Sequence, residues 1–244
     1  MNGGGLPGGT AWWWTQVTRL GEAQILLPAM ALALVWLLRQ PGGRPLAGVW
    51  LLATGVAVGI TTVSKVLFLG FAIGHAPLDF TGFSGHAMFA AALMPVLLRL
   101  ALGPRSADGR RRVLILGYLL ALAVAVSRVK VGAHSVSEVV TGFSLGAAAS
   151  AAALRAGRWP ALGLARWMPV VLLAWALVAV TGAPASRTHD AVTQLALALS
   201  GRPQAYQRWE MHRDHQRQQS PPALSLPALS LPALSTPALS LPTG

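Results

Sequence analysis

Long apolar runs, separated by short segments that carry arginines, constrain the fold of this chain more than any other feature. The runs cover about residues 22–38, 46–69, 85–102, 113–126, 136–154 and 168–181. A helix crosses the hydrocarbon core with about 20 apolar residues, and each run reaches toward that length through its flanks. Inside lipid the backbone has to satisfy its own hydrogen bonds. The pattern therefore predicts an all-α fold: a polytopic membrane helix bundle with about six transmembrane helices.

Composition agrees with a membrane protein. Of the 244 residues, 54% are hydrophobic and 11% are charged, which excludes an ordinary soluble domain. The chain has no cysteine, so disulfides and thiolate chemistry are excluded. The net charge of +12 comes from basic residues dispersed among apolar runs. That distribution is typical of contacts with anionic lipids. We expect membrane lipids, and no nucleic acid, as partners.

The chain divides by composition into a membrane domain and its flanks. Residues 1–20 are a short tail without the basic region of a cleaved signal peptide. Residues 21–185 form the membrane domain. Residues 186–219 are a polar tail in which residues 191–199 could form an amphipathic helix on the membrane surface. Residues 220–244 repeat Pro-Ala-Leu-Ser-Leu, and prolines at that spacing predict a disordered extension.

The arginines predict the orientation of the bundle. The first, third and fifth connecting segments contain Arg39, Arg44, Arg105, Arg110, Arg111, Arg112, Arg155, Arg158 and Arg166. Short loops rich in arginine stay in the cytoplasm. The second and fourth segments then share the non-cytoplasmic face of the plasma (inner) membrane, where residues distant in sequence can meet.

Polar motifs lie on that shared face, each before an apolar run. One contains Ser84-Gly85-His86. A helix N-terminus there could hold an anion, although Ser84 could also serve only as the helix cap. The chain's two lysines, Lys65 and Lys130, lie near the same face. A lone lysine can extend to the membrane interface, but these two lie close to a third basic residue, which favours an anionic partner.

His134 and Glu138, four residues apart, form the second motif. If a helix begins by His134, both side chains lie on one face, and the carboxylate can orient the imidazole. Two alternatives are open. The pair could be a helix-terminal ion pair, or these residues could bind zinc together with His75, His86 and Asp79. The surrounding basic residues favour an anionic ligand, phosphate above all.

These motifs resemble the three signatures of the type 2 phosphatidic acid phosphatase superfamily, over about residues 65–138. The matching residues are Lys65, Ser84, Gly85, His86, Ser127, Arg128, His134 and Glu138. The resemblance implies that His134 is a nucleophile forming a phosphohistidine, that Glu138 orients it, and that His86 protonates the leaving group. The residues that would hold the phosphoryl oxygens are Lys65, Ser84, Gly85 and Arg128. The family needs no metal or other cofactor.

The sequence departs from the family pattern at three positions. Position 72 is alanine where the first signature has an arginine. Lys130 or His75 would have to replace that cation. Phe83 stands in place of a proline, and Glu138 in place of an aspartate that is one methylene shorter.

The resemblance implies an integral membrane hydrolase of lipid metabolism. It would be a metal-independent phosphatase that removes phosphate from a lipid phosphomonoester or diphosphate through a phosphohistidine. The missing arginine motivates one alternative, a non-catalytic protein of the same fold that binds or translocates lipid phosphates. A second alternative is an unrelated small membrane transporter, in which the polar residues line a pathway and the two imidazoles need not meet.

Overall fold

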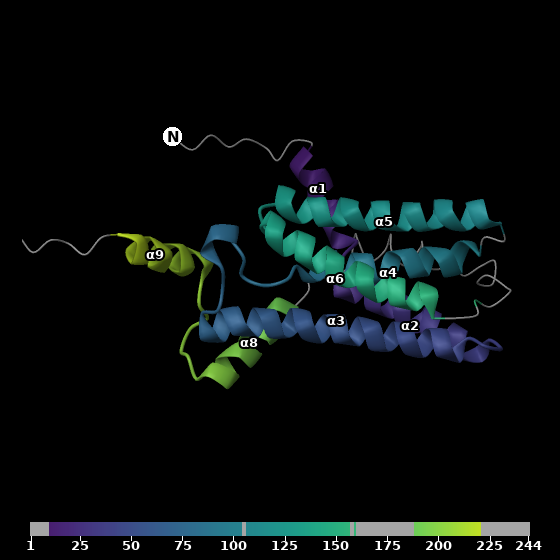
Figure 1. Ribbon diagram of the computed structural model, residues 1–244, viewed down its shortest axis with the longest axis horizontal. Helices are drawn as coiled ribbons and strands as arrows, with labels where there is room; N and C mark the ends of the chain where they lie inside the picture. Colours follow the sequence, from purple (N-terminus) through teal and green to yellow (C-terminus); the bar gives the residue numbers. More distant parts are fainter. Residues whose placement is uncertain (1–9, 104–105, 157–158, 160–187, 221–244) are drawn as a thin grey trace, which may run out of the picture.

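The computed structural model describes residues 10–103, 106–156, 159 and 188–220, which fold mainly into helices (Figure 1). The α-helices are α1 (Thr10–Arg19), α2 (Ala23–Arg39), α3 (Arg44–Phe71), α4 (Gly85–Leu102), α5 (Ala107–Lys130), α6 (Val136–Arg155), α8 (Thr188–Ser200) and α9 (Arg208–Gln219). A 3₁₀ turn, η1 (Ala76–Leu78), follows α3. The predicted all-α fold is confirmed, because the only pairing of strand type among these residues is one isolated bridge between His75 and Phe80.

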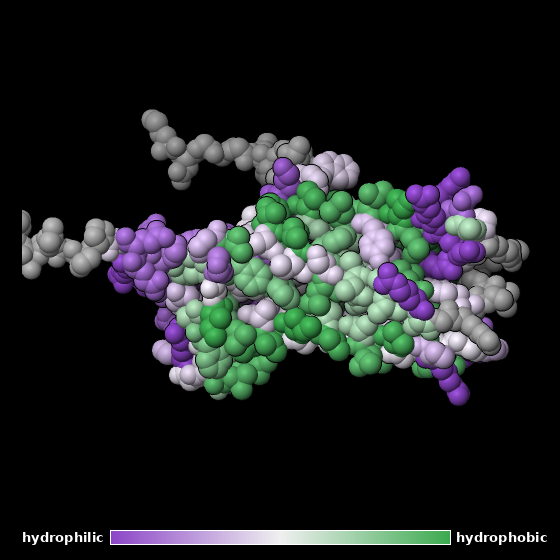
Figure 2. Space-filling view, in the orientation of Figure 1, coloured by the Kyte–Doolittle hydropathy of each residue, from purple (hydrophilic) through white to green (hydrophobic). Residues whose placement is uncertain are grey.

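Five helical stretches of the described residues are long and apolar enough to cross a membrane. They are Trp12–Arg39, Arg44–Phe71, Gly85–Leu102, Ala107–Lys130 and Val136–Arg155. Apolar side chains such as Leu52 (69% exposed) and Val63 (57% exposed) cover their outer surface. Figure 2 shows this apolar surface between two hydrophilic ends. The membrane helix bundle is confirmed. The sixth expected run, 168–181, and the repeats of residues 221–244 lie outside the described residues.

Helices also form in both flanks of the expected membrane domain. The helical region begins at Thr10, inside the expected tail of residues 1–20, and α1 packs against α5. In the polar tail, α8 contains the segment predicted to be an amphipathic helix and packs along α3. Ala196 of α8 is fully buried, whereas Leu199 is exposed. Both flanks therefore contribute helices that pack onto the bundle.

Helix α4 lies at the centre of the core and packs against α5 and α6. Most of its residues between positions 87 and 97 are buried. Helix α6 approaches it closely because it has glycines at the contact. A Cβ atom at Gly142 would lie 2.5 Å from the carbonyl oxygen of Ser84, and one at Gly146 would collide with the carbonyl oxygen of Met88. The small residues of α6 thus bring its first turns against the start of α4.

The two connecting segments that carry the polar motifs lie at the same end of the bundle, near α8 and α9 (Figure 1). The backbone N–H of Ser84 donates to the carbonyl oxygen of Glu138 at 3.0 Å. The hydroxyl of Ser137 donates to the carbonyl oxygen of Leu78 at 2.7 Å. Topology therefore brings these segments together, as the sequence predicts.

Candidate active site

A cavity of about 770 Å³ opens at the end of the bundle where the polar motifs meet. Basic and imidazole side chains from five different segments line it: Lys65 of α3, His86 of α4, Arg128 of α5, His134 of the α5–α6 loop and Arg208 of α9. Glu22, before α2, contributes a carboxylate to the lining. Apolar residues of α3, α4 and α8 complete the wall. The cavity is therefore lined by basic and histidine side chains on one part of its wall and by apolar side chains of the bundle on the rest.

One part of the site contains donors that form no ion pair in the described residues, and we call Lys65, Ser84 and Arg128 the donor cluster. Ser84 occupies the N-cap position of α4, yet its hydroxyl makes no capping hydrogen bond. That hydroxyl and the Nε of Arg128 are buried and find no hydrogen-bond partner among the described residues. Capping therefore does not account for the Ser84 side chain. Buried donors of this kind cost free energy unless a ligand satisfies them.

Neither of the two cations of the donor cluster forms an ion pair in the described part of the chain. Arg128 uses its Nη1 to donate to the Thr18 hydroxyl of α1 at 2.8 Å. Lys65, near the end of α3, has no ion pair within the described ranges. Gly85, the first residue of α4, also lines the cavity, and a side chain there would meet no atom within 4 Å. The cluster thus offers room and positive charge for an anion.

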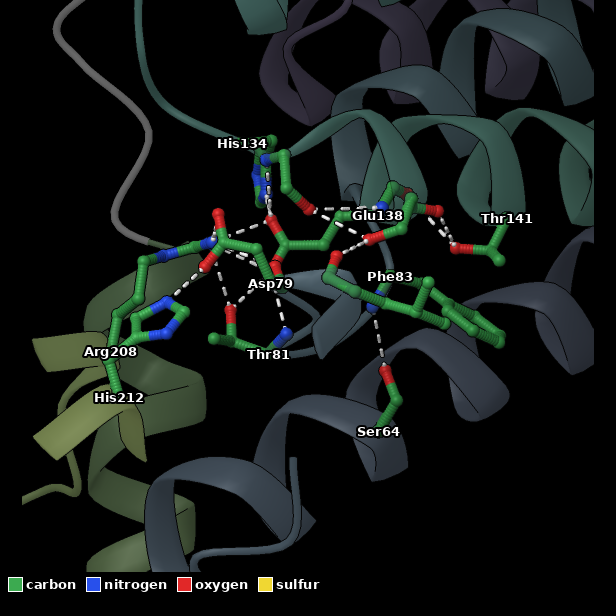
Figure 3. Close-up of polar contacts among 12 residues, drawn as sticks. Ser64, Asp79, Thr81, Phe83, His134, Glu138, Thr141, Arg208 and His212 are labelled. Atoms are coloured by element: carbon green, nitrogen blue, oxygen red, sulfur yellow. Dashed lines mark hydrogen bonds and ion pairs between the residues drawn. The ribbon is translucent and has the colours of Figure 1, made fainter. Parts of the chain in front are cut away.

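His134 is held by Glu138 through its Nδ1, 2.7 Å from Oε2 of the carboxylate (Figure 3). The helix begins at Val136 rather than at His134, so Glu138 reaches back from the first turn of α6. Glu138 also completes a capping box with Ser135. Because a carboxylate only accepts hydrogen bonds, the imidazole proton sits on Nδ1, and Nε2 keeps its lone pair.

Burial favours the neutral form of His134. It lowers the pKa of this imidazole below its ordinary value, and the nearby Lys65 and Arg128 charges act in the same direction. The hydrogen bond with Glu138 opposes this change without overcoming it. At neutral pH, His134 therefore presents an unprotonated Nε2, which is the state that a nucleophile requires.

Glu138 is fully buried, and every hydrogen-bonding direction of its carboxylate is used. Its Oε1 accepts from the backbone N–H of Thr81 at 2.7 Å and from the hydroxyl of the same residue. The Nη2 of Arg208 lies 2.8 Å from Oε1 and 2.9 Å from Oε2. We call Asp79, Thr81, Glu138, Arg208 and His212 the carboxylate cluster. It fixes the group that in turn orients His134.

Arg208 is the residue that sequence reasoning missed. Its Nη1 pairs with Asp79 at 2.6 Å, and His212, one turn further along α9, contacts the other Asp79 oxygen at 2.7 Å. Burial alone would raise the pKa of Asp79, but the hydrogen bonds from Arg208 and His212 lower it. The polar tail has several arginines, and no spacing rule in the sequence distinguishes this one.

The two auxiliary residues proposed from sequence do not join the cavity. Lys130 is exposed at the end of α5, and His75 is exposed while its backbone pairs with Phe80. The zinc alternative also finds no support in the geometry. Among the described residues, no three or more histidines and carboxylates gather closely enough to hold a metal ion. Asp79 and Glu138 are engaged by Arg208 instead.

Similarity to known proteins points in one direction. The family model of the PAP2 superfamily matches residues 25–161. A protein of Klebsiella pneumoniae described as an uncharacterized 22.5 kDa protein in the cps region is 40% identical over 138 residues, 57% of this chain and 66% of that protein. Phosphatidylglycerophosphatase B of Bacillus subtilis (strain 168) is 31% identical over 140 residues, 54% of this chain and 68% of that protein. The chain thus spans about two thirds of these relatives. No solved structure matches it significantly.

Proposed function

The chain belongs to the PAP2 superfamily, and on this premise we propose that it hydrolyses a lipid phosphomonoester or diphosphate through a phosphohistidine at His134. Membership indicates an integral membrane phosphatase acting on lipid phosphates. It also excludes the unrelated transporter. One observation carries the proposal furthest: an oriented, neutral imidazole lines the same cavity as Arg128, whose buried Nε has no partner in the described residues.

The proposed reaction has two steps, each with one bond formed and one broken. In the first, His134 Nε2 forms a bond to phosphorus as the ester P–O bond breaks, and His86, entering the step as an imidazolium, donates a proton to the leaving oxygen and becomes neutral. In the second, His86 takes a proton from water, whose oxygen bonds to phosphorus as the P–N bond breaks. Phosphate leaves and both imidazoles return to their starting states.

The residues around His134 match what phosphoryl transfer demands of a protein. Catalysis of this step consists mainly of positioning and of stabilising charge on the equatorial oxygens. Lys65, Ser84, Gly85 and Arg128 would bind those oxygens, and Glu138 would keep Nε2 aimed at phosphorus. The surplus of cations in the lining favours an anionic ligand over a metal ion. We therefore expect hydrolysis to persist in excess EDTA.

The proposed location is the non-cytoplasmic face of the plasma membrane. Arginines at the opposite end of the bundle, Arg39, Arg44, Arg110, Arg111, Arg112 and Arg155, support this orientation through the positive-inside trend. Because the chain has no cysteine, single cysteines can test it. An impermeant maleimide added to intact cells should label Leu78→Cys and spare Asp108→Cys. The reverse pattern would overturn the orientation.

Phosphate release from a panel of lipids in detergent tests the function itself. The panel contains phosphatidic acid, an isoprenyl diphosphate and phosphatidylglycerophosphate, the last suggested by the name of the Bacillus relative. We expect release from at least one lipid, reduced by about 1,000-fold or more in His134→Ala because the nucleophile is gone. Acid-labile labelling of wild type from a ³²P-lipid, absent in the variant, would identify the phosphohistidine.

The alternative is a non-catalytic lipid-phosphate protein of the same fold, motivated by alanine at position 72. It predicts binding of the same lipids without release from any of them. Equal, residual release by wild type and His134→Ala would support it and contradict the phosphatase.

A further inference from the structure

Arg208 contacts Asp79, Thr81 and Glu138, although it lies in the sequence beyond the region that matches the family model. Its guanidinium spans two carboxylates, Glu138 through Nη2 and Asp79 through Nη1. The same two nitrogens reach the hydroxyl of Thr81 at 3.2 Å and the carbonyl oxygen of Asp79 at 2.8 Å. One side chain thus ties α9 to the α3–α4 segment and to the first turn of α6 (Figure 3).

These contacts decide between two roles for Arg208. A cation that binds phosphate should not be paired with a carboxylate, and neither Lys65 nor Arg128 forms an ion pair in the described residues. Both Nη groups of Arg208 instead donate hydrogen bonds to protein oxygens. A planar guanidinium suits such a bridge because its donors are held in a rigid fork. Its contacts therefore fit holding Glu138 better than binding substrate.

The segment before Arg208 is anchored to the end of α3. The backbone N–H of Tyr206 donates to the carbonyl oxygen of Leu69 at 2.8 Å, and the Tyr206 ring packs edge-on against Phe68. Met211 of α9 is buried in the same apolar cluster. Burial and a hydrogen bond to Asp214 raise the pKa of Tyr206 to about 12, so its hydroxyl stays protonated as the donor.

Ala72 packs against this same apolar cluster. It occupies the position where the family resemblance expects an arginine. The same cluster contains Tyr206 and Met211, which flank Arg208 in the sequence. Position 72 and the residues that flank Arg208 therefore contact the same apolar cluster.

We propose that Arg208 is a positioning residue that clamps Glu138, and through it His134. This proposal rests on the phosphatase function. It adds a residue from α9 to the machinery and makes the C-terminal segment a part of the active site. Loss of the clamp should slow the chemical step and leave lipid binding nearly unchanged.

The first experiment compares Arg208→Gln, Arg208→Lys and Glu138→Gln in the full chain, with phosphatidic acid in detergent micelles as substrate, or the panel lipid that wild type hydrolyses fastest. We expect kcat to fall about 10- to 100-fold in Arg208→Gln, because a displacement of about 1 Å has that effect, while KM changes less than about twofold. Arg208→Lys should recover part of kcat, since lysine keeps the charge without the fork.

A double-mutant cycle separates the clamp from direct phosphate binding. If Arg208 acts through Glu138, adding Arg208→Gln to the Glu138→Gln variant should lower kcat by less than about a further twofold. The proposal would be overturned if the two single losses in kcat multiplied fully in the double variant. It would also be overturned if KM and the inhibition constant of inorganic phosphate rose in Arg208→Gln. Wild-type kcat in Arg208→Gln would also overturn it.

Arg213→Gln is the matched control. Arg213 lies on the same helix, pairs with Asp214 and stacks on Trp209, away from Glu138. We expect wild-type kcat and KM. If Arg208→Gln fails to elute as a folded species, the kcat-against-KM comparison is made with Arg208→Lys. An unchanged kcat in that variant would then count against the clamp.

An activity-independent readout keeps the two proposals distinguishable. If Arg208 holds Glu138 against His134, its removal should lower the pKa of His134, because the hydrogen bond with Glu138 raises this pKa and would loosen. Titration of ¹⁵N-histidine signals, with His134 assigned from His134→Ala, measures this even if wild type releases no phosphate from any lipid. A downward change supports the clamp, and an upward change would mean that the Arg208 charge acts on His134 directly. An unchanged titration contradicts it, whatever the fate of the phosphatase function.

Discussion

The donor cluster and the carboxylate cluster both contribute to the lining of one cavity, through Lys65 and Arg128 and through Thr81 and Arg208, but their polar groups are satisfied to different degrees. In the donor cluster, the hydroxyl of Ser84 and the Nε of Arg128 are buried without partners among the described residues. In the carboxylate cluster, both oxygens of Glu138 are used, and Arg208 bridges it to Asp79. Each cluster contains cations, so charge alone does not separate them.

This contrast indicates a different role for each cluster in the site. A satisfied network holds its members in one arrangement, and its partly apolar surroundings strengthen each hydrogen bond. Unsatisfied donors raise the free energy of the empty site, and a tetrahedral anion would relieve that cost. Under the proposed function, the carboxylate cluster would orient the nucleophile, and the donor cluster would bind the phosphoryl group.

The largest expected effect that tests this division is in the donor cluster. Arg128→Ala should lower kcat/KM by about 100- to 1,000-fold, because it removes a cation from the developing charge. The inhibition constant of inorganic phosphate should rise in parallel. If Arg128→Ala lowers kcat but leaves the inhibition constant of inorganic phosphate unchanged, Arg128 is a positioning residue. The division between the two clusters would then be wrong.

Glu138→Asp tests the carboxylate cluster. Aspartate is one methylene shorter, so it cannot keep both His134 and Arg208 at their present distances. We expect kcat to fall about 10- to 100-fold with little change in KM. A rise in kcat would mean that the glutamate is displaced from its best geometry. Glu138→Gln gives the reference value for a side chain of equal length without charge.

Ser84→Ala should separate stability from activity. The hydroxyl has no hydrogen-bond partner in the described residues, so its removal orphans no protein group. We expect an unchanged or slightly higher Tm in detergent, together with a loss of about tenfold in kcat/KM. A Tm several degrees lower would mean that Ser84 belongs to a structural network, contrary to its placement in the donor cluster.

The pH dependence links the two clusters and is the smallest expected effect. Above its pKa, His134 is neutral and can attack; below it, the protonated imidazole cannot. Since burial lowers that pKa, the acid limb of kcat/KM should lie below about pH 6.5, the ordinary value for histidine. Lys65→Met should move this limb upward, because the Lys65 charge also lowers the pKa. A wild-type limb above pH 6.5 would contradict the buried, neutral nucleophile.

The sequence predicted the local parts of this protein well. Apolar runs predicted the helices because burial in lipid imposes both length and hydrophobicity. Arginine-bearing loops predicted that Ser84 and His134 lie at one end. The four-residue spacing of His134 and Glu138 predicted their contact, although α6 begins only at Val136 and the glutamate reaches back to make it.

Neither auxiliary cation proposed from the sequence, Lys130 or His75, lines the cavity, because proximity along the chain does not determine where a side chain points. Lys130 lies two residues from Arg128 and has an exposed side chain outside the cavity. Arg208 lies 70 residues from Glu138 and contacts both of its oxygens. Nothing in its local pattern differs from that of Arg213, whose side chain bonds to its neighbour Asp214.

Helix positions and the order of the motifs follow from the sequence by itself, since they depend on hydrophobicity and on spacings of a few residues. Which cations remain free and which are paired was decided only by the tertiary structure. Pairing depends on where separate helices dock, and α9 docks through Tyr206 and Met211 on the end of α3. Those contacts join residues far apart in the chain, beyond the reach of any local pattern.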